Sequence, residues 1–173
     1  MIGRSLLKWI GADESTVEPG VLDRIAAALD NLAPGRARYV AAFAYLLARV
    51  AGVDSHVTAD EMDLMHRLVQ READLSDEEA KLIVDFALGD TRRFAGTHNL
   101  DVTREFMGLS THAQRLGLLR CLFAISAADD SVATAEDNEI RRITRELRIE
   151  HAEFIAARAE VREHLAVLKG HRP

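Results

Sequence analysis

Apolar residues recur along most of the chain at the spacing of amphipathic helices. Two stretches are different, because 39–51 is small or apolar apart from Arg49 and 112–128 carries a similarly dense apolar run. A helix with so few polar positions must be buried on nearly all sides, so these two stretches predict the centre of the structure. Helices are expected over 21–31, 36–52, 58–73, 76–89, 101–107, 112–128, 134–147 and 150–169.

Helix-start and helix-stop residues mark the ends of these elements. Ser or Thr followed three residues later by Glu forms a capping box, and Gly or Pro interrupts a helical pattern. Pro34-Gly35 is expected to end the 21–31 helix, and Gly108 to keep the 101–107 helix short. The expected helix starts are Thr58–Glu61, Ser76–Glu79, either Ser110 or Thr111, and Thr134.

An acidic pattern occurs twice. Asp54 to Glu61 reads Asp-x-x-Val-x-x-x-Glu, and Asp129 to Glu136 repeats that pattern 75 residues later. Similar apolar residues flank both copies, which indicates a duplicated helix-loop-helix unit. The prediction is an all-α fold, a single helical bundle of seven to eight helices with an internal pseudo-twofold repeat and both acidic loops at one end.

Length and charge limit the classes of protein to consider. The chain has 173 residues and a formal net charge of −6, which argues against a nucleic-acid partner because phosphate binding needs a basic surface. The longest apolar runs are shorter than the ~20 residues that span a bilayer. The single Cys121 lies in an apolar run and predicts a buried thiol in a reducing compartment. We expect a cytoplasmic protein without a secretory signal.

The N-terminal segment is amphipathic. Its apolar face is expected to dock on the domain or on a partner, while an alternative is peripheral contact with a membrane through residues 1–10. The domain prediction separates this segment and the loop that follows, 1–19, from a helical domain, 20–168, and a tail, 169–173. The residues on the apolar face are Ile2, Leu6, Trp9 and Ile10.

The two acidic motifs are the candidate chemistry. In 53–63 and 129–139 there are nine Asp or Glu residues and no Lys or Arg. Carboxylates ~5 Å apart repel by roughly 3 kcal/mol at an effective dielectric of ~20, so a converged cluster needs a cation, a shared proton or open water. Ca²⁺ or Mg²⁺ suits oxygen ligands better than Zn²⁺ does. The candidate ligands are Asp54, Glu61, Asp129, Asp130 and Glu136.

A purely structural explanation stands beside the metal hypothesis. Glu61 is already accounted for as the capping-box residue, and Asp54 could cap the amides of its own loop. The motif is also not an EF-hand, because its Asp-to-Glu spacing is too short and it lacks the glycine in the middle of the loop. Both explanations stay open on the residues alone.

The paired motifs resemble the TerB-like (tellurite resistance protein B) family over about residues 20–168. Its signature approximates Ala-Asp-Gly-x-Ile-x-x-x-Glu-x-x-x-Ile, which Ala128–Ile140 matches well and Val53–Met65 less closely. Ser55 and Asp130 replace the motif glycine. The resemblance implies a helical bundle whose acidic residues gather at a metal-binding surface, and a role in tellurite resistance or stress response.

These observations lead to a ranked set of functions. The first is a non-enzymatic TerB-like domain that binds a divalent cation and presents an acidic surface to protein partners. The second is a metal-free interaction scaffold, peripheral to the membrane in one version. The third is a metal-dependent hydrolase, which ranks last because the sequence contains no nucleophile-base pairing and no phosphate-binding loop.

Overall fold

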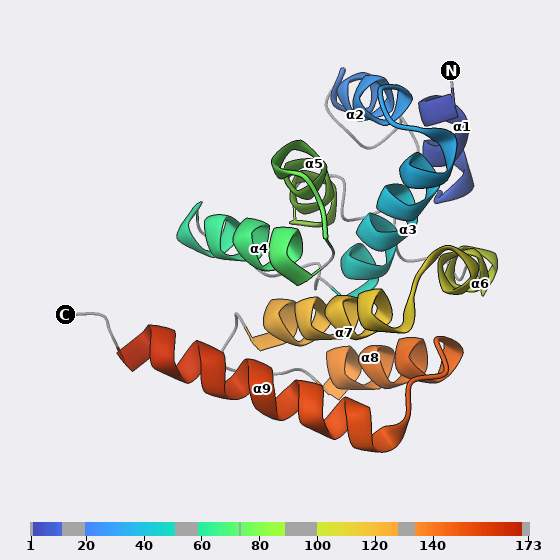
Figure 1. Cartoon of the computed structure of the whole chain (residues 1–173). Helices are drawn as coiled ribbons and strands as arrows, with labels where there is room; N and C mark the ends of the chain where they lie inside the picture. Colours follow the sequence, from blue (N-terminus) through green and yellow to red (C-terminus); the bar gives the residue numbers. More distant parts are fainter. Residues whose placement is uncertain are drawn as a thin grey trace.

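The computed structural model describes residues 2–11, 20–50, 59–72, 74–88, 100–127 and 134–170. Within these ranges the fold is all-α, as predicted, and comprises nine helices instead of seven to eight, because both 2–9 and 100–109 form regular helices (Figure 1). The internal repeat stays a prediction. The helices are α1 (Ile2–Trp9), α2 (Val21–Asp30), α3 (Pro34–Val50), α4 (Ala59–Glu72), α5 (Asp77–Leu88), α6 (Leu100–Leu109), α7 (His112–Ala127), α8 (Thr134–Glu146) and α9 (His151–Gly170).

Two helices form the centre of the bundle. Every residue of α3 from Tyr39 to Val50 is buried except Arg49, whose side chain is buried although the residue as a whole is partly exposed. In α7, the residues from Gly117 to Ser126 are buried apart from Arg120. The two helices contact each other, α1, α2, α5, α6 and α8 lie against α3, and α4, α8 and α9 lie against α7. The prediction that both apolar stretches are central is therefore confirmed.

Proline and glycine act differently from expectation at two helix ends. Pro34 is the first residue of α3, a position that needs no backbone N–H, so Pro34-Gly35 opens the central helix after α2 has ended at Asp30. Gly108 lies inside α6, which continues to Leu109. The Ser110 hydroxyl donates to the Phe106 carbonyl oxygen at 2.6 Å and satisfies one acceptor at this helix end.

The capping predictions at Ser76 and at the start of α7 are confirmed, while Thr134 is the first residue of α8 and its capping role stays a prediction. The Ser76 N–H donates to the Glu79 carboxylate at 2.9 Å, and the Glu79 N–H donates to Ser76 Oγ at 3.2 Å. Thr111 and Gln114 exchange the same two bonds at the start of α7, which identifies Thr111 and not Ser110 as the cap. Each box supplies partners for amides that a helix start would otherwise leave unpaired.

The N-terminal helix is docked on the domain. Leu6, Leu7 and Ile10 are buried, and α1 lies against α2 and α3. Its backbone approaches α2 closely, since Gly3 lies against the Ala26 carbonyl and its N–H donates to Asp30 Oδ1 at 2.7 Å. The apolar face proposed for a membrane is thus used inside the protein. In the described part of the chain, no helix is both long and apolar enough to cross a bilayer.

Two outer helices end in the same backbone motif. The Leu75 N–H donates to the Gln70 carbonyl oxygen after α4, and the Ile149 N–H donates to the Thr144 carbonyl oxygen after α8. In both, the residue before the donor has positive φ, 51° at Asp74 and 54° at Arg148. This is the Schellman arrangement, followed each time by a buried apolar residue. It turns the chain from α4 into α5 and from α8 into α9.

Candidate metal site

The predicted ligands are only partly within the described residues. Asp54, Asp129 and Asp130 lie outside them, and so does the side chain of Glu61, whose backbone is in the first turn of α4. Glu136 lies in the first turn of α8 with a half-buried side chain. Among the side chains that the structure describes, no three or more His, Cys, Asp or Glu residues are grouped to hold a metal. The convergence of the two motifs therefore stays a prediction.

His66 and Cys121 are side chains of the types that Zn²⁺ prefers, but both have other surroundings. His66 Nε2 lies 3.1 Å from the Asp77 carbonyl oxygen, which places the imidazole at the start of α5. Cys121 is fully buried, and this burial raises the pKa of its thiol well above the ordinary value. A thiol that stays protonated is a poor metal ligand. These surroundings argue against a Zn²⁺ site built from His66 and Cys121.

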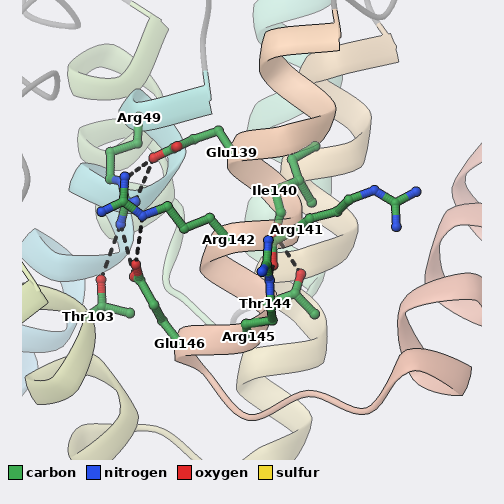
Figure 2. A network of polar contacts seen from close by, with 9 residues as sticks. All are labelled: Arg49, Thr103, Glu139, Ile140, Arg141, Arg142, Thr144, Arg145 and Glu146. Carbon is green, nitrogen blue, oxygen red and sulfur yellow. Dashed lines mark hydrogen bonds and ion pairs between the residues drawn. The ribbon is translucent and has the colours of Figure 1, made fainter.

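A buried arginine lies beside the acidic first half of α8. Arg49, in the last turn of α3, has 5% of its side chain exposed. Its Nε donates to Glu139 Oε1 at 2.8 Å, and its Nη1 donates to Thr103 Oγ1 at 3.2 Å and to Glu146 Oε2 at 3.3 Å (Figure 2). Arg142 Nε donates to the other Glu146 oxygen at 3.2 Å. We call Arg49, Thr103, Glu139, Arg142 and Glu146 the Arg49 cluster.

A related contact holds the other outer helix. Arg120 of α7 donates to Glu72 Oε2 at 3.1 Å and to Glu160 of α9 at 2.9 Å. Glu72 is the last residue of α4, and Glu146 is the last residue of α8. A carboxylate is unfavourable at the negative, C-terminal end of a helix. In each case an arginine of a central helix pairs with the carboxylate at the C-terminal end of an outer helix and offsets this charge. Arg49 links α3 to α8, and Arg120 links α7 to α4.

Sequence reasoning did not identify the function of Arg49. Its partners are 54 to 97 residues away, so no local pattern connects them. The available signal was the charge itself, because a lone arginine in an otherwise apolar helix must find carboxylate partners when that helix is buried. The contact also brings the end of α3, from which the chain leaves for the first motif, beside the helix that begins in the second motif.

The comparisons with known proteins identify the family. The family model described as tellurite resistance protein TerB matches residues 40–159. This span begins in α3, ends in α9, and contains all five candidate ligands as well as Arg49 and Arg120. No curated protein and no solved structure matches the chain. Because the matched span covers more than half of the chain, the protein belongs to the TerB family.

Proposed function

We propose that this TerB-family protein is a non-enzymatic domain that binds a divalent cation, Ca²⁺ or Mg²⁺ in preference to Zn²⁺, through its two acidic motifs. The observation that carries the proposal is the contact of Arg49, in the last turn of α3, with Glu139, near the middle of α8. This contact holds the end of α3, which the first motif follows in the sequence, against the helix that contains Glu136. The two motifs together concentrate carboxylates without an adjacent Lys or Arg in the sequence.

The consequence of cation binding would be structural or regulatory. Hard divalent ions take several carboxylate and carbonyl oxygens, and ligands from both motifs would tie the two halves of the bundle together. An acidic surface whose charge depends on the cation could then bind protein partners differently in its loaded and empty states. The family name suggests tellurite resistance or a wider stress response as the setting.

A calorimetric titration tests this proposal. The protein is stripped with chelator and titrated with Ca²⁺, Mg²⁺, Mn²⁺ and Zn²⁺, beside an Asp54→Asn/Asp129→Asn variant. We expect saturable binding in the parent protein and its loss in the variant, with thermal stability rising only where the cation binds. Absence of binding by every ion would reject the cation function.

A metal-free scaffold is the second candidate, and α9 provides the observation in its favour. Ile155 and Val167 have 47% and 59% of their surfaces exposed on this helix. Single exposed apolar residues are normal on a protein surface, so these two would act as contact points only for a partner that lies along α9. If no cation binds, Ile155→Ser and Val167→Ser should weaken partner binding without lowering the stability of the domain.

A further inference from the structure

We propose that Arg49 is a positioning residue for the acidic first half of α8, and that it thereby controls the affinity of the domain for a divalent cation. The affinity part of this inference rests on the proposed function. The positioning part concerns α3, α6 and α8 alone and is tested without a cation. Arg49 itself would bind no cation, since its guanidinium is positively charged.

The spacing of the glutamates shows how one arginine can orient a helix. Glu139 and Glu146 are seven residues apart and therefore share one face of α8. Arg49 contacts both of them, Glu139 at 2.5 Å from Nη2 and Glu146 at 3.3 Å from Nη1. Two points of attachment separated by two helical turns restrict the rotation of α8 about its own axis.

That rotation decides where Glu136 lies. Glu136 and Glu139 are three residues apart, so their side chains are neighbours on the surface of α8. Holding Glu139 against the end of α3 directs the adjacent turn, with Glu136, toward the same side of the bundle. If α8 rotated, Glu136 would move with it, and a ligand set that depends on Glu136 would lose its geometry.

The position of Arg49 is fixed from a third helix. Thr103 of α6 is almost completely buried, and its hydroxyl oxygen accepts a hydrogen bond from Arg49 Nη1 (Figure 2). The guanidinium therefore donates hydrogen bonds to one hydroxyl and two carboxylates in a largely desolvated environment. A lysine cannot reproduce this, because its ammonium is one compact charge without the planar fork.

Arg120 provides a matched comparison within the same chain. It also joins a central helix to the last residue of an outer helix, but its side chain is 28% exposed and its partners are Glu72 and Glu160, outside α8. Replacing Arg120 removes an inter-helix ion pair of the same kind. It should loosen α4 while leaving the orientation of α8 unchanged.

The experiment compares Arg49→Lys and Arg49→Met with Arg120→Met. Amide hydrogen exchange is measured on the metal-free proteins, and the rates in α8 are divided by those in α4. Both Arg49 variants should raise this ratio at least tenfold, and Arg120→Met should lower it. Ca²⁺ titrated by calorimetry should then bind the Arg49→Lys protein at least tenfold more weakly than the parent, and Arg120→Met within threefold of the parent. Arg49→Lys keeps the charge and provides the measurement if Arg49→Met does not fold.

The two readouts separate the failure of this inference from the failure of the proposed function. An unchanged exchange ratio in both Arg49 variants would overturn the positioning of α8, whatever the calorimetry shows. Equal weakening of Ca²⁺ binding by Arg49→Lys and Arg120→Met would overturn the specific control by Arg49. If the parent binds no cation while the exchange ratio rises as expected, the cation function and the affinity part are rejected and the positioning of α8 is supported.

Discussion

Gly117 of α7 lies so close to the backbone of α4 that a Cβ atom at this position would be 2.2 Å from the Glu72 carbonyl oxygen. We expect Gly117→Ala to push the two helices apart and to lower the free energy of unfolding by roughly 1–3 kcal/mol, as overpacking does. Urea unfolding measures the change.

Gly108→Ala is the control for that substitution. Gly108 also lies in a helix, but an added Cβ there would meet nothing within 4 Å. Alanine should raise stability by up to about 1 kcal/mol through its higher helix propensity. Equal effects at both glycines would contradict the close approach of α4 and α7.

The features that the sequence predicted are those with a local cause. The capping boxes at Ser76 and Thr111 depend on residues three apart, and the burial of α3 follows from an apolar run that offers no polar face. The Arg49 cluster and the Gly117 contact depend on helix packing between distant parts of the chain, which residue patterns do not reveal. For the candidate site, Glu136 was correctly expected near the start of a helix, while Asp54, Asp129 and Asp130 lie outside the described residues.

The ion pair between Glu79 and Arg36 predicts a specific dependence of stability on pH. Hydrogen bonds from Arg36, at 2.8 and 2.9 Å, are the main reason why the pKa of Glu79 is held below its ordinary 4.5. A carboxyl whose pKa is lowered by folding stabilises the protein above its unfolded-state pKa, and this contribution is lost as the pH falls through the lowered value.

Glu79→Gln should therefore cost stability at pH 7, and the difference from the parent should shrink below about pH 4.5. Urea unfolding at pH 7, 5, 4 and 3 tests this. Glu78→Gln is the control, because Glu78 is exposed on the same turn of α5. A Glu79→Gln effect as large at pH 3 as at pH 7 would show that packing, and not charge, explains the loss.

Cys121 should be unreactive in the folded protein. Its side chain is fully buried in α7, and burial raises the pKa of its thiol, so both access and the reactive thiolate are restricted. Labelling with a disulfide reagent should be at least about a hundredfold slower than labelling of free glutathione, and should reach the glutathione rate in denaturant. Rapid labelling under native conditions would contradict the packing of α7 against its neighbours.

Cation binding should also appear as a gain in stability that depends on Glu136. A ligand that binds only the folded state adds about 2.7 kcal/mol at 100 times its Kd, so Ca²⁺ should raise the unfolding free energy of the stripped parent protein and chelator should reverse the gain. Glu136→Gln should abolish most of this gain.

Asp101→Asn is the matched control, because Asp101 is also an acid in the first turn of a helix, α6, but belongs to neither motif. Both substitutions remove a favourable charge near a helix N-terminus, worth roughly 0.3–1 kcal/mol, so both should lower the cation-free stability slightly. A Ca²⁺-dependent gain that survives in Glu136→Gln would exclude Glu136 as a ligand.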